Sequence, residues 1–198
     1  MEQMTPVQTV YWVLYGLWIL SEVFIVLKTR TSRSKGNVQD RGSMALLWVV
    51  IFSSIGVANW FAATRPHNMF QSSGLDGGQW LLPLSALVLA IGLAIRWTAI
   101  VTLGKAFSVN VAIHHDQKVL RTGIFRFVRH PSYTGLMIVF LAIGLHLRNW
   151  TALAFVILPP LAALLYRIHV EEAALNGAFG ADYADYSRST KRLIPFVY

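Results

Sequence analysis

Long apolar stretches alternate with short polar segments along the 198 residues of this chain. Five such stretches stand out, at residues 7–27, 44–64, 80–103, 133–147 and 150–168. A helix needs roughly 20 apolar residues to cross the hydrocarbon core of a bilayer, so the pattern predicts an all-α integral membrane protein with five transmembrane helices. Only Arg148 and Asn149 separate the short fourth stretch from the fifth, which predicts a tight antiparallel hairpin.

The composition points to the same class of protein. Hydrophobic residues make up 55% of the chain and charged residues 13%, whereas a soluble domain carries roughly 25% charged residues. The length suits a single domain. The first stretch has no basic region before it and is followed by basic residues, so we expect a retained span and not a cleaved signal peptide. The chain has no cysteine, which excludes disulfides, thiolate metal sites and a cysteine nucleophile.

The distribution of Lys and Arg predicts the orientation of the helices. These residues gather in segments 28–43 and 104–132 and in the tail, whereas the alternate segments hold only Arg65 and Arg148. Cytosolic loops carry an excess of Lys and Arg, so we expect the N-terminus outside and the C-terminus in the cytosol. This bias accounts for the net charge of +8, and no nucleic-acid partner is predicted. The lack of an added targeting segment favours a prokaryotic inner membrane.

The segment 129–135 reads Arg-His-Pro-Ser-Tyr-Thr-Gly and lies where a basic loop meets the fourth apolar stretch. Pro131 disfavours helix at the preceding residue, so we expect His130 on extended backbone just before a helix starts. The free N–H groups of the first helical turn favour an anion, and Arg129 adds a positive charge. Gly135 allows another backbone or a ligand to approach closely. The alternative is that Arg129 and His130 simply face lipid headgroups.

A second polar cluster follows at the end of the fifth stretch. Glu171 lies four residues after Arg167, on the same face of a helix. The two residues form either a surface ion pair or, together with Glu172, a site for the amine, hydroxyls or positive centre of a ligand.

Two charges lie within predicted spans, where they are costly and usually paired. We expect Arg96 to extend to the interface, and Glu22 is a candidate partner for it. No two histidines lie four residues apart on one span, so no metal site is predicted. Segment 104–132 is too long for a structureless loop, and we expect it to fold over the cytosolic face as a lid or pocket wall.

Several spaced motifs in the last hundred residues resemble those of the isoprenylcysteine carboxyl methyltransferase family, within the wider set of membrane methyltransferases that includes phospholipid methyltransferases. They are the run from 120 to 135, Arg167 with Glu171 and Glu172, and Phe-Gly-Ala-Asp-Tyr-Ala-Asp-Tyr at 179–186, followed by Pro195. The resemblance covers roughly residues 92–198. It implies one membrane domain, with N-terminal spans in 1–90 and a methyltransferase core in 91–198.

The resemblance also implies a pocket for S-adenosylmethionine at the cytosolic face, formed by the C-terminal half. Arg167 would face the acceptor, and we expect Arg129 and Glu172 to act as catalytic residues that orient the reacting groups. Gln117 stands where the family commonly has histidine, and Phe125 where it commonly has tyrosine. The implied cofactor-binding residues are Asn110, Gln117, Lys118, Val119, Leu120, Phe125, His130, Pro131, Ser132, Tyr133 and Glu171.

The implied reaction is methyl transfer to a lipid-like acceptor, with a carboxylate of the prenylcysteine type as the family-level expectation. A carboxylate with a pKa near 4 needs no general base at neutral pH, and a lipidic acceptor can enter sideways from the membrane lipids. Three alternatives stay open: amino methylation of a phospholipid, methylation of a small hydrophobic thiol or carboxylate, and a non-enzymatic transporter or scaffold. The oligomeric state is not predicted.

Overall fold

The structure is a computed structural model that describes residues 4–29, 37–38, 42–64, 78–104, 107, 112–113, 118–195 and 197. Six α-helices occur in this part of the chain: α1 (Pro6–Thr29), α2 (Ser43–Thr64), α3 (Gly78–Leu103), α4 (Pro131–Leu147), α5 (Trp150–Phe179) and α6 (Ala181–Ser189). A 3-10 turn, η2 (Gly123–Arg126), precedes α4. Two short strands, β1 (Asn37–Val38) and β2 (Ala112–Ile113), form an antiparallel pair.

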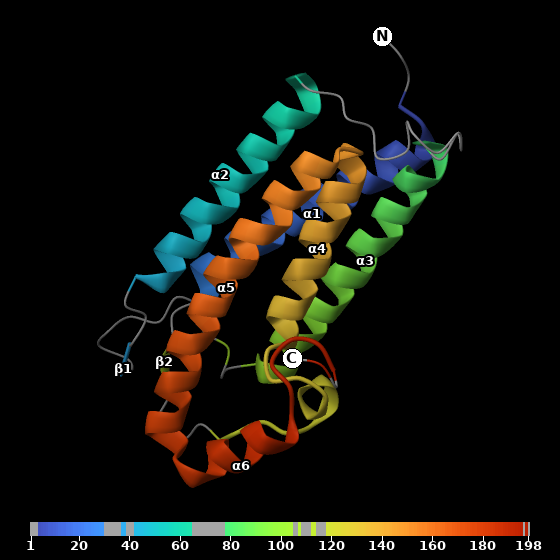
Figure 1. Cartoon of the computed structure of the whole chain (residues 1–198). Helices are drawn as coiled ribbons and strands as arrows, with labels where there is room; N and C mark the ends of the chain where they lie inside the picture. Colours follow the sequence, from blue (N-terminus) through green and yellow to red (C-terminus); the bar gives the residue numbers. More distant parts are fainter. Residues whose placement is uncertain are drawn as a thin grey trace.

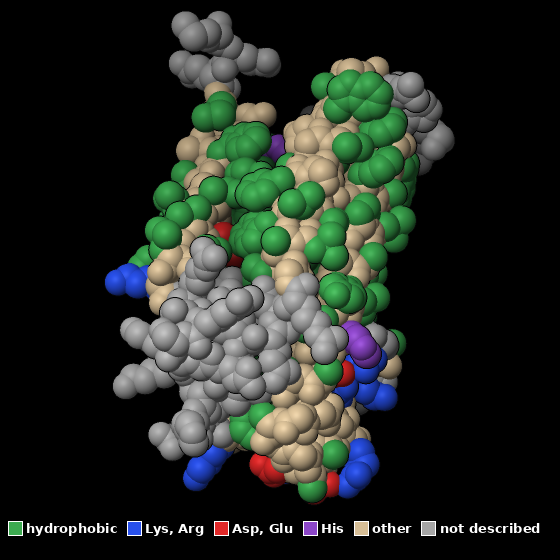
Figure 2. Space-filling view, turned by 90° about the vertical axis from the view of Figure 1, so that its left-hand side faces the viewer, with side chains coloured by type: hydrophobic (Ala, Val, Ile, Leu, Met, Phe, Trp, Pro, Cys, Tyr) green, Lys and Arg blue, Asp and Glu red, His purple; other side chains and the backbone are tan. Residues whose placement is uncertain are grey.

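The five long helices form one bundle, and α6 lies across one end of it (Figure 1). Helix α4 packs against both α3 and α5, and α2 packs along α5. The two termini lie at opposite ends of the bundle (Figure 1). Figure 2 shows hydrophobic side chains along the length of the bundle, while charged side chains gather toward the end that carries α6. The polar end of the molecule is therefore the end at which both polar motifs of the sequence lie.

Helix lengths confirm an all-helical membrane protein. Four of the described helices are long and apolar enough to cross a bilayer: Pro6–Lys28, Ser43–Thr64, Trp80–Leu103 and Trp150–Phe179. The predicted fourth span corresponds to α4, a shorter apolar helix of 17 residues. Helix α5 runs for 30 residues and extends beyond the apolar stretch that ends at 168, so that it includes Glu171 and Glu172 as expected. Hydropathy marks where apolar residues end, but the helix continues through Ala, Glu and Leu, which favour helix, and it ends at Gly180, where φ is +52°.

The predicted hairpin between α4 and α5 is confirmed. Arg148 adopts the left-handed conformation, with φ 53° and ψ 28°, and ends α4. The side chain of Asn149 then caps α5, because it accepts a hydrogen bond from the backbone N–H of Ala152 at 2.9 Å. Two residues are thus enough to reverse the chain.

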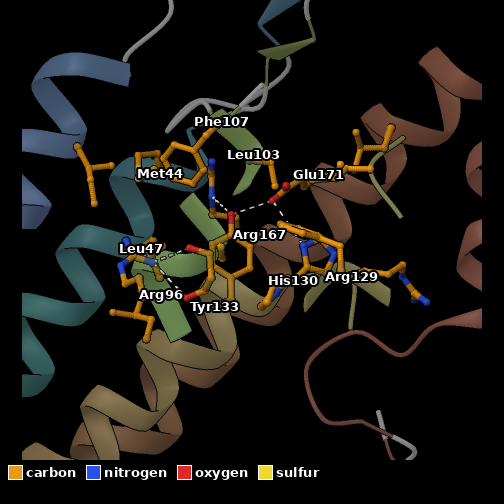
Figure 3. Close-up of a pocket in the computed structure, with 18 of the residues that line it drawn as sticks. Met44, Leu47, Arg96, Leu103, Phe107, Arg129, His130, Tyr133, Arg167 and Glu171 are labelled. Atoms are coloured by element: carbon orange, nitrogen blue, oxygen red, sulfur yellow. Dashed lines mark hydrogen bonds and ion pairs between the residues drawn. The ribbon is translucent and has the colours of Figure 1, made fainter. Parts of the chain in front are cut away.

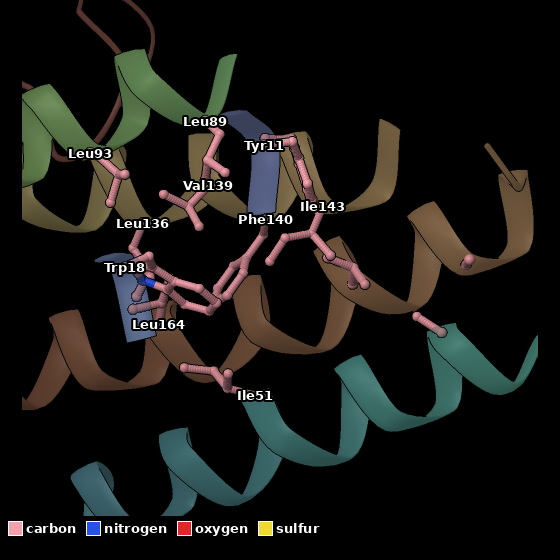
Figure 4. Packing of buried hydrophobic residues seen from close by; sticks show 14 of the residues in the cluster. Tyr11, Trp18, Ile51, Leu89, Leu93, Leu136, Val139, Phe140, Ile143 and Leu164 are labelled. Carbon is pink, nitrogen blue, oxygen red and sulfur yellow. The ribbon is translucent and has the colours of Figure 1, made fainter. Parts of the chain in front are cut away.

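Helices α3 and α4 approach closely through two glycines. A methyl group built at Gly135 would lie 2.7 Å from the backbone nitrogen of Arg96 and 2.7 Å from the carbonyl oxygen of Gly92. Within a bilayer, helix association depends on such close backbone packing because lipid tails are as apolar as the side chains. The buried residues around this contact include Leu136, Val139 and Phe140 of α4 (Figure 4). The close approach predicted at Gly135 is therefore to the backbone of α3.

We predict that Gly135→Ala lowers the melting temperature of the detergent-purified protein. The added methyl group forces α3 and α4 apart, and such overpacking costs about 1–3 kcal/mol. Gly56→Ala in α2 is the matched control, since a methyl group there meets nothing within 4 Å. Thermal unfolding followed by tryptophan fluorescence distinguishes the two variants, and an unshifted melting temperature for Gly135→Ala would contradict the packing described here.

Candidate active site

A cavity of about 160 Å³ lies at the polar end of the bundle. All six helices and the segment 118–125 contribute to its walls. One part of the lining is apolar and comes from α1 and α2, with Ile25, Val26, Met44, Leu47 and Trp48. Another part is polar and comes from the start of α4 and the end of α5, with His130, Tyr133, Arg167 and Glu171. The lining of this one cavity therefore has an apolar part and a charged part (Figure 3).

Tyr133 links the two charged residues of α5 that face the cavity. Its hydroxyl donates to Glu171 Oε2 at 2.7 Å and accepts from Arg167 Nε at 3.0 Å (Figure 3). Arg167 is 2% exposed, so the surface ion pair considered from the sequence is not what forms here. A second hydrogen bond runs from Arg167 to Ser43 Oγ at 2.8 Å, which ties the start of α2 to the site. The guanidinium is thus held in one orientation.

Glu171 remains accessible, in contrast to Arg167. Its side chain is 29% exposed, and its Oε2 lies 4.0 Å from Nδ1 of His130. The ring of His130 stacks on the ring of Tyr133, with centroids 5.6 Å apart and an interplanar angle of 14°. A partly exposed carboxylate beside an imidazole and a phenol can bind a cationic or hydroxyl-bearing ligand.

Glu172 faces the protein and not the cavity. Its Oε1 accepts from Arg129 Nε at 2.9 Å and lies 3.3 Å from His130 Nε2, while its Oε2 accepts from Arg192 Nε at 3.0 Å. Successive residues of an α-helix point about 100° apart, so Glu171 and Glu172 have different surroundings. A buried carboxylate held by two guanidinium groups is well compensated. The catalytic role of Arg129 and Glu172 stays a prediction, and these contacts favour a positioning role.

The C-terminal tail holds the segment that leads into α4. Backbone N–H groups of Arg129 and His130 donate to the carbonyl oxygens of Lys191 and Arg192 at 2.7 and 3.0 Å. The Arg129 guanidinium also donates to the carbonyl oxygens of Ser187 and Thr190. His130 has φ −121° and ψ 56°, so the prediction of extended backbone there is wrong. Its N–H is bonded to the tail at Arg192, and its carbonyl oxygen accepts from both Tyr133 and Thr134, so contacts on both sides of the residue set its dihedral angles.

Arg96 is buried inside the bundle and does not extend to the interface, which corrects the expectation from the sequence. It is 6% exposed and forms a paired contact with Glu22, at 2.5 Å from Nε and 2.6 Å from Nη2. Its Nη1 donates to Ser132 Oγ at 2.9 Å. Pairing with Glu22 and Ser132 satisfies the charge within the membrane span, so the partner suggested by the sequence is the one observed.

Tyr186 fixes α6 to the segment before α4. Its hydroxyl donates to the carbonyl oxygen of Phe125 at 2.7 Å. Burial raises the pKa of Tyr186 to about 12, so the phenol is protonated at neutral pH and acts as a donor. Helix α6 therefore packs as a wall of the site.

The structure brings together most of the residues that the sequence singled out. Those that line the cavity are Lys118, Val119, Leu120, Phe125, Arg129, His130, Pro131, Ser132, Tyr133, Arg167 and Glu171. Asn110 and Gln117 lie outside the described residues. The sequence did not indicate the lining from α1 and α2, because an apolar residue facing a cavity has the same local pattern as one facing lipid. It also gave no role to Tyr183, although its spacing from Tyr186 places both on one face of α6.

Comparisons with known proteins agree with this arrangement. Residues 84–177 match the model of the Isoprenylcysteine carboxyl methyltransferase (ICMT) family. The chain is 32% identical to Protein-S-isoprenylcysteine O-methyltransferase A of Arabidopsis thaliana over 127 residues, which are 63% of this chain and 64% of that protein. It is 33% identical to Protein-S-isoprenylcysteine O-methyltransferase of Schizosaccharomyces pombe over 111 residues, 55% of this chain and 47% of that protein. The chain thus spans less than two thirds of the length of these relatives.

A solved structure supports the fold over almost the whole chain. It is that of the eukaryotic intramembrane Ras methyltransferase ICMT, with a TM-score of 0.62 and 23% sequence identity. The similarity covers 98% of this chain and 68% of that one. The N-terminal helices, which lie outside the match to the family model, are therefore part of the shared fold.

We predict that Glu172→Gln destabilises the protein strongly. Removing the charge leaves Arg129 and Arg192 without their carboxylate, and breaking a buried ion pair costs about 3–5 kcal/mol. Asp185→Asn is the control, since the pair of Asp185 with Arg188 on α6 is exposed and such pairs contribute about 0–1 kcal/mol. Thermal unfolding in detergent measures both variants. If the two shift the melting temperature equally, Glu172 does not hold the tail and the start of α4 together.

Proposed function

We propose that this chain is a member of the isoprenylcysteine carboxyl methyltransferase family, whose model matches residues 84–177. It then transfers a methyl group from S-adenosylmethionine to a lipid-like acceptor that carries a carboxylate of the prenylcysteine type. The observation that carries the proposal is the meeting of the Tyr133, Arg167 and Glu171 cluster with an apolar wall in one cavity. An amphiphilic acceptor needs both surfaces at once. The curated relatives are named for the same reaction.

The residues around the cavity fit the cofactor. S-adenosylmethionine carries an amine, a carboxylate, a sulfonium and an adenosine. Glu171 is a partly exposed carboxylate suited to the amine. The imidazole of His130, which lines the cavity, suits the carboxylate, and the buried ring of Phe125 suits the adenosine. When bound there, the cofactor supplies an electrophilic methyl group on its sulfonium.

Arg167 is the residue that we assign to the acceptor carboxylate. It is buried, its position is fixed by Tyr133 and Ser43, and a guanidinium binds a carboxylate with two parallel hydrogen bonds. A carboxylate acceptor is already ionised at neutral pH, so no residue has to remove a proton. The protein then contributes orientation of the two reactants and exclusion of water.

The apolar wall from α1 and α2 is the part of the cavity that we assign to the hydrocarbon chain of the acceptor. Ile25, Val26, Met44, Leu47 and Trp48 lie at the end of the bundle where the polar residues are. A prenyl chain contacting them stays in an apolar environment as it leaves the lipid, while its polar end reaches Arg167. The N-terminal spans would then take part in substrate binding, which supports a single domain over residues 1–198.

We further propose five membrane crossings, with the N-terminus outside and the polar end in the cytosol, where the cofactor is made. An odd number of crossings agrees with termini at opposite ends of the bundle (Figure 1). The short helix α4 would cross as part of its hairpin with α5. The Lys and Arg bias supports this orientation, and a prokaryotic inner membrane stays a prediction.

We predict that the detergent-purified protein binds S-adenosylhomocysteine and that Glu171→Gln weakens binding about tenfold to a hundredfold, the range for a hydrogen bond to a charged group. Asp185→Asn, which loses only an exposed pair with Arg188 within α6, is the control and should bind as the wild type does. Calorimetric titration measures all three proteins. No binding to folded wild type would overturn the proposed reaction, and unchanged binding in Glu171→Gln would remove Glu171 from the site.

We predict methyl transfer from labelled cofactor to an N-acetylated S-farnesylcysteine, and none to the matching amide, which lacks the carboxylate. Arg167→Lys should lower kcat/KM for this acceptor while the affinity for S-adenosylhomocysteine stays unchanged, because lysine keeps the charge but loses the planar pair of donors. Activity only on phosphatidylethanolamine would defeat the carboxylate assignment and favour an amino methyltransferase.

A further inference from the structure

The hydroxyl group of Tyr183 is buried without a partner. Tyr183 is 3% exposed and lines the cavity, yet its hydroxyl has no hydrogen bond to any part of the chain that the structure describes. A buried polar group left unsatisfied costs about 1–3 kcal/mol, and native proteins keep few of them. A buried hydroxyl that belongs to a cavity-lining residue and lacks a protein partner is suited to a ligand.

The ring that carries this hydroxyl is held in place by its neighbours. Tyr186, three residues further along α6, contacts it edge to face with ring centroids 6.0 Å apart. Tyr186 is itself bonded to the carbonyl oxygen of Phe125, and Arg121 donates to the carbonyl oxygen of Asp182 at 2.7 Å. Helix α6 is thus tied to the segment before α4 on both sides of Tyr183. The orientation of its hydroxyl is set before any ligand arrives.

The charge around Tyr183 makes its hydroxyl a neutral donor. Burial raises the pKa of Tyr183, and the nearby carboxylates of Glu172 and Glu171 raise it further, whereas Arg129 lowers it. A protonated phenol can donate one hydrogen bond and accept others. It therefore matches a ligand group that has a hydrogen-bond acceptor, such as a ring nitrogen or a hydroxyl oxygen.

The walls on this side of the cavity are apolar and aromatic. They come from the end of α5, which leads into α6, and from the segment before α4, with Leu175, Phe179, Leu120 and Phe125. Flat apolar walls with one directed polar group are typical of a site for a heterocyclic base. The charged groups suited to an amino acid moiety, His130 and Glu171, lie at the start of α4 and further back along α5.

We propose that the hydroxyl of Tyr183 hydrogen-bonds to the adenosine part of the cofactor, which makes α6 the wall of the nucleoside end of the site. This assignment rests on the proposed function, since it takes S-adenosylmethionine as the ligand. It adds a binding residue from the C-terminal helix, downstream of every residue assigned to the cofactor from the sequence.

The test compares two variants that each lose one hydroxyl from the same helix. Tyr183→Phe removes a group that has no partner in the described protein, so the ligand-free protein should melt at the same or a higher temperature. Tyr186→Phe removes the bond to Phe125 and should melt at a lower temperature. Affinity for S-adenosylhomocysteine should fall about threefold to tenfold in Tyr183→Phe, the loss of one neutral hydrogen bond.

Adenosine as a second probe locates the contact. Measured by displacement of labelled S-adenosylhomocysteine, the affinity for adenosine should fall by the same factor in Tyr183→Phe, whereas Glu171→Gln should affect only S-adenosylhomocysteine. Wild-type affinity of Tyr183→Phe for both probes would overturn the inference alone. A loss confined to S-adenosylhomocysteine would overturn the assignment to adenosine. Failure of the wild type to bind would overturn the proposed function and this inference with it.

Discussion

The Glu172 carboxylate is the interaction on which the arrangement of the polar end depends. It receives hydrogen bonds from Arg129, at the segment before α4, and from Arg192, in the tail. Three parts of the chain that are distant in sequence meet at one buried anion. Its partner residue Arg129 also bonds to two carbonyl oxygens at the end of α6. The start of α4 is thereby fixed relative to α5, and the groups that face the cavity take their positions from it.

The bilayer imposes the other constraint on the site. Helices in lipid gain little from burying apolar surface, so they associate through close backbone contact and compensated charges. Gly92 and Gly135 provide the contact between α3 and α4, and Glu22 with Arg96 joins α1 to α3. Because Arg96 also bonds to Ser132, the same pair holds the first turn of α4 from inside the membrane. The start of α4 is thus supported from two sides, by the Arg129–Glu172 ion pair on one side and by the hydrogen bond from Arg96 to Ser132 on the other.

Much of the fold and part of the site could be predicted from local pattern. The apolar stretches predicted the helices α1 to α5, and the two-residue connection at Arg148 and Asn149 predicted the hairpin between α4 and α5. Helix α5 continues past the apolar stretch that ends at 168, as the expected helical spacing of Arg167 and Glu171 requires. The snorkelling of Arg96 was wrong, since snorkelling assumes that no closer counter-ion exists. Helical spacing predicted that Arg167 and Glu171 lie on one face of a helix. It did not predict that the hydroxyl of Tyr133 links them.

The sequence alone determined the class of protein, the number of apolar helices and the two motifs that supply the polar groups, because these depend on composition and on spacing along one segment. Only the tertiary structure decided that Glu171 faces the cavity while Glu172 holds Arg129 and Arg192. It also decided that α1 and α2 line the cavity and that the hydroxyl of Tyr183 is buried there. A side chain facing a cavity, a helix or lipid has the same sequence pattern in each case, and the difference arises only when distant segments pack together.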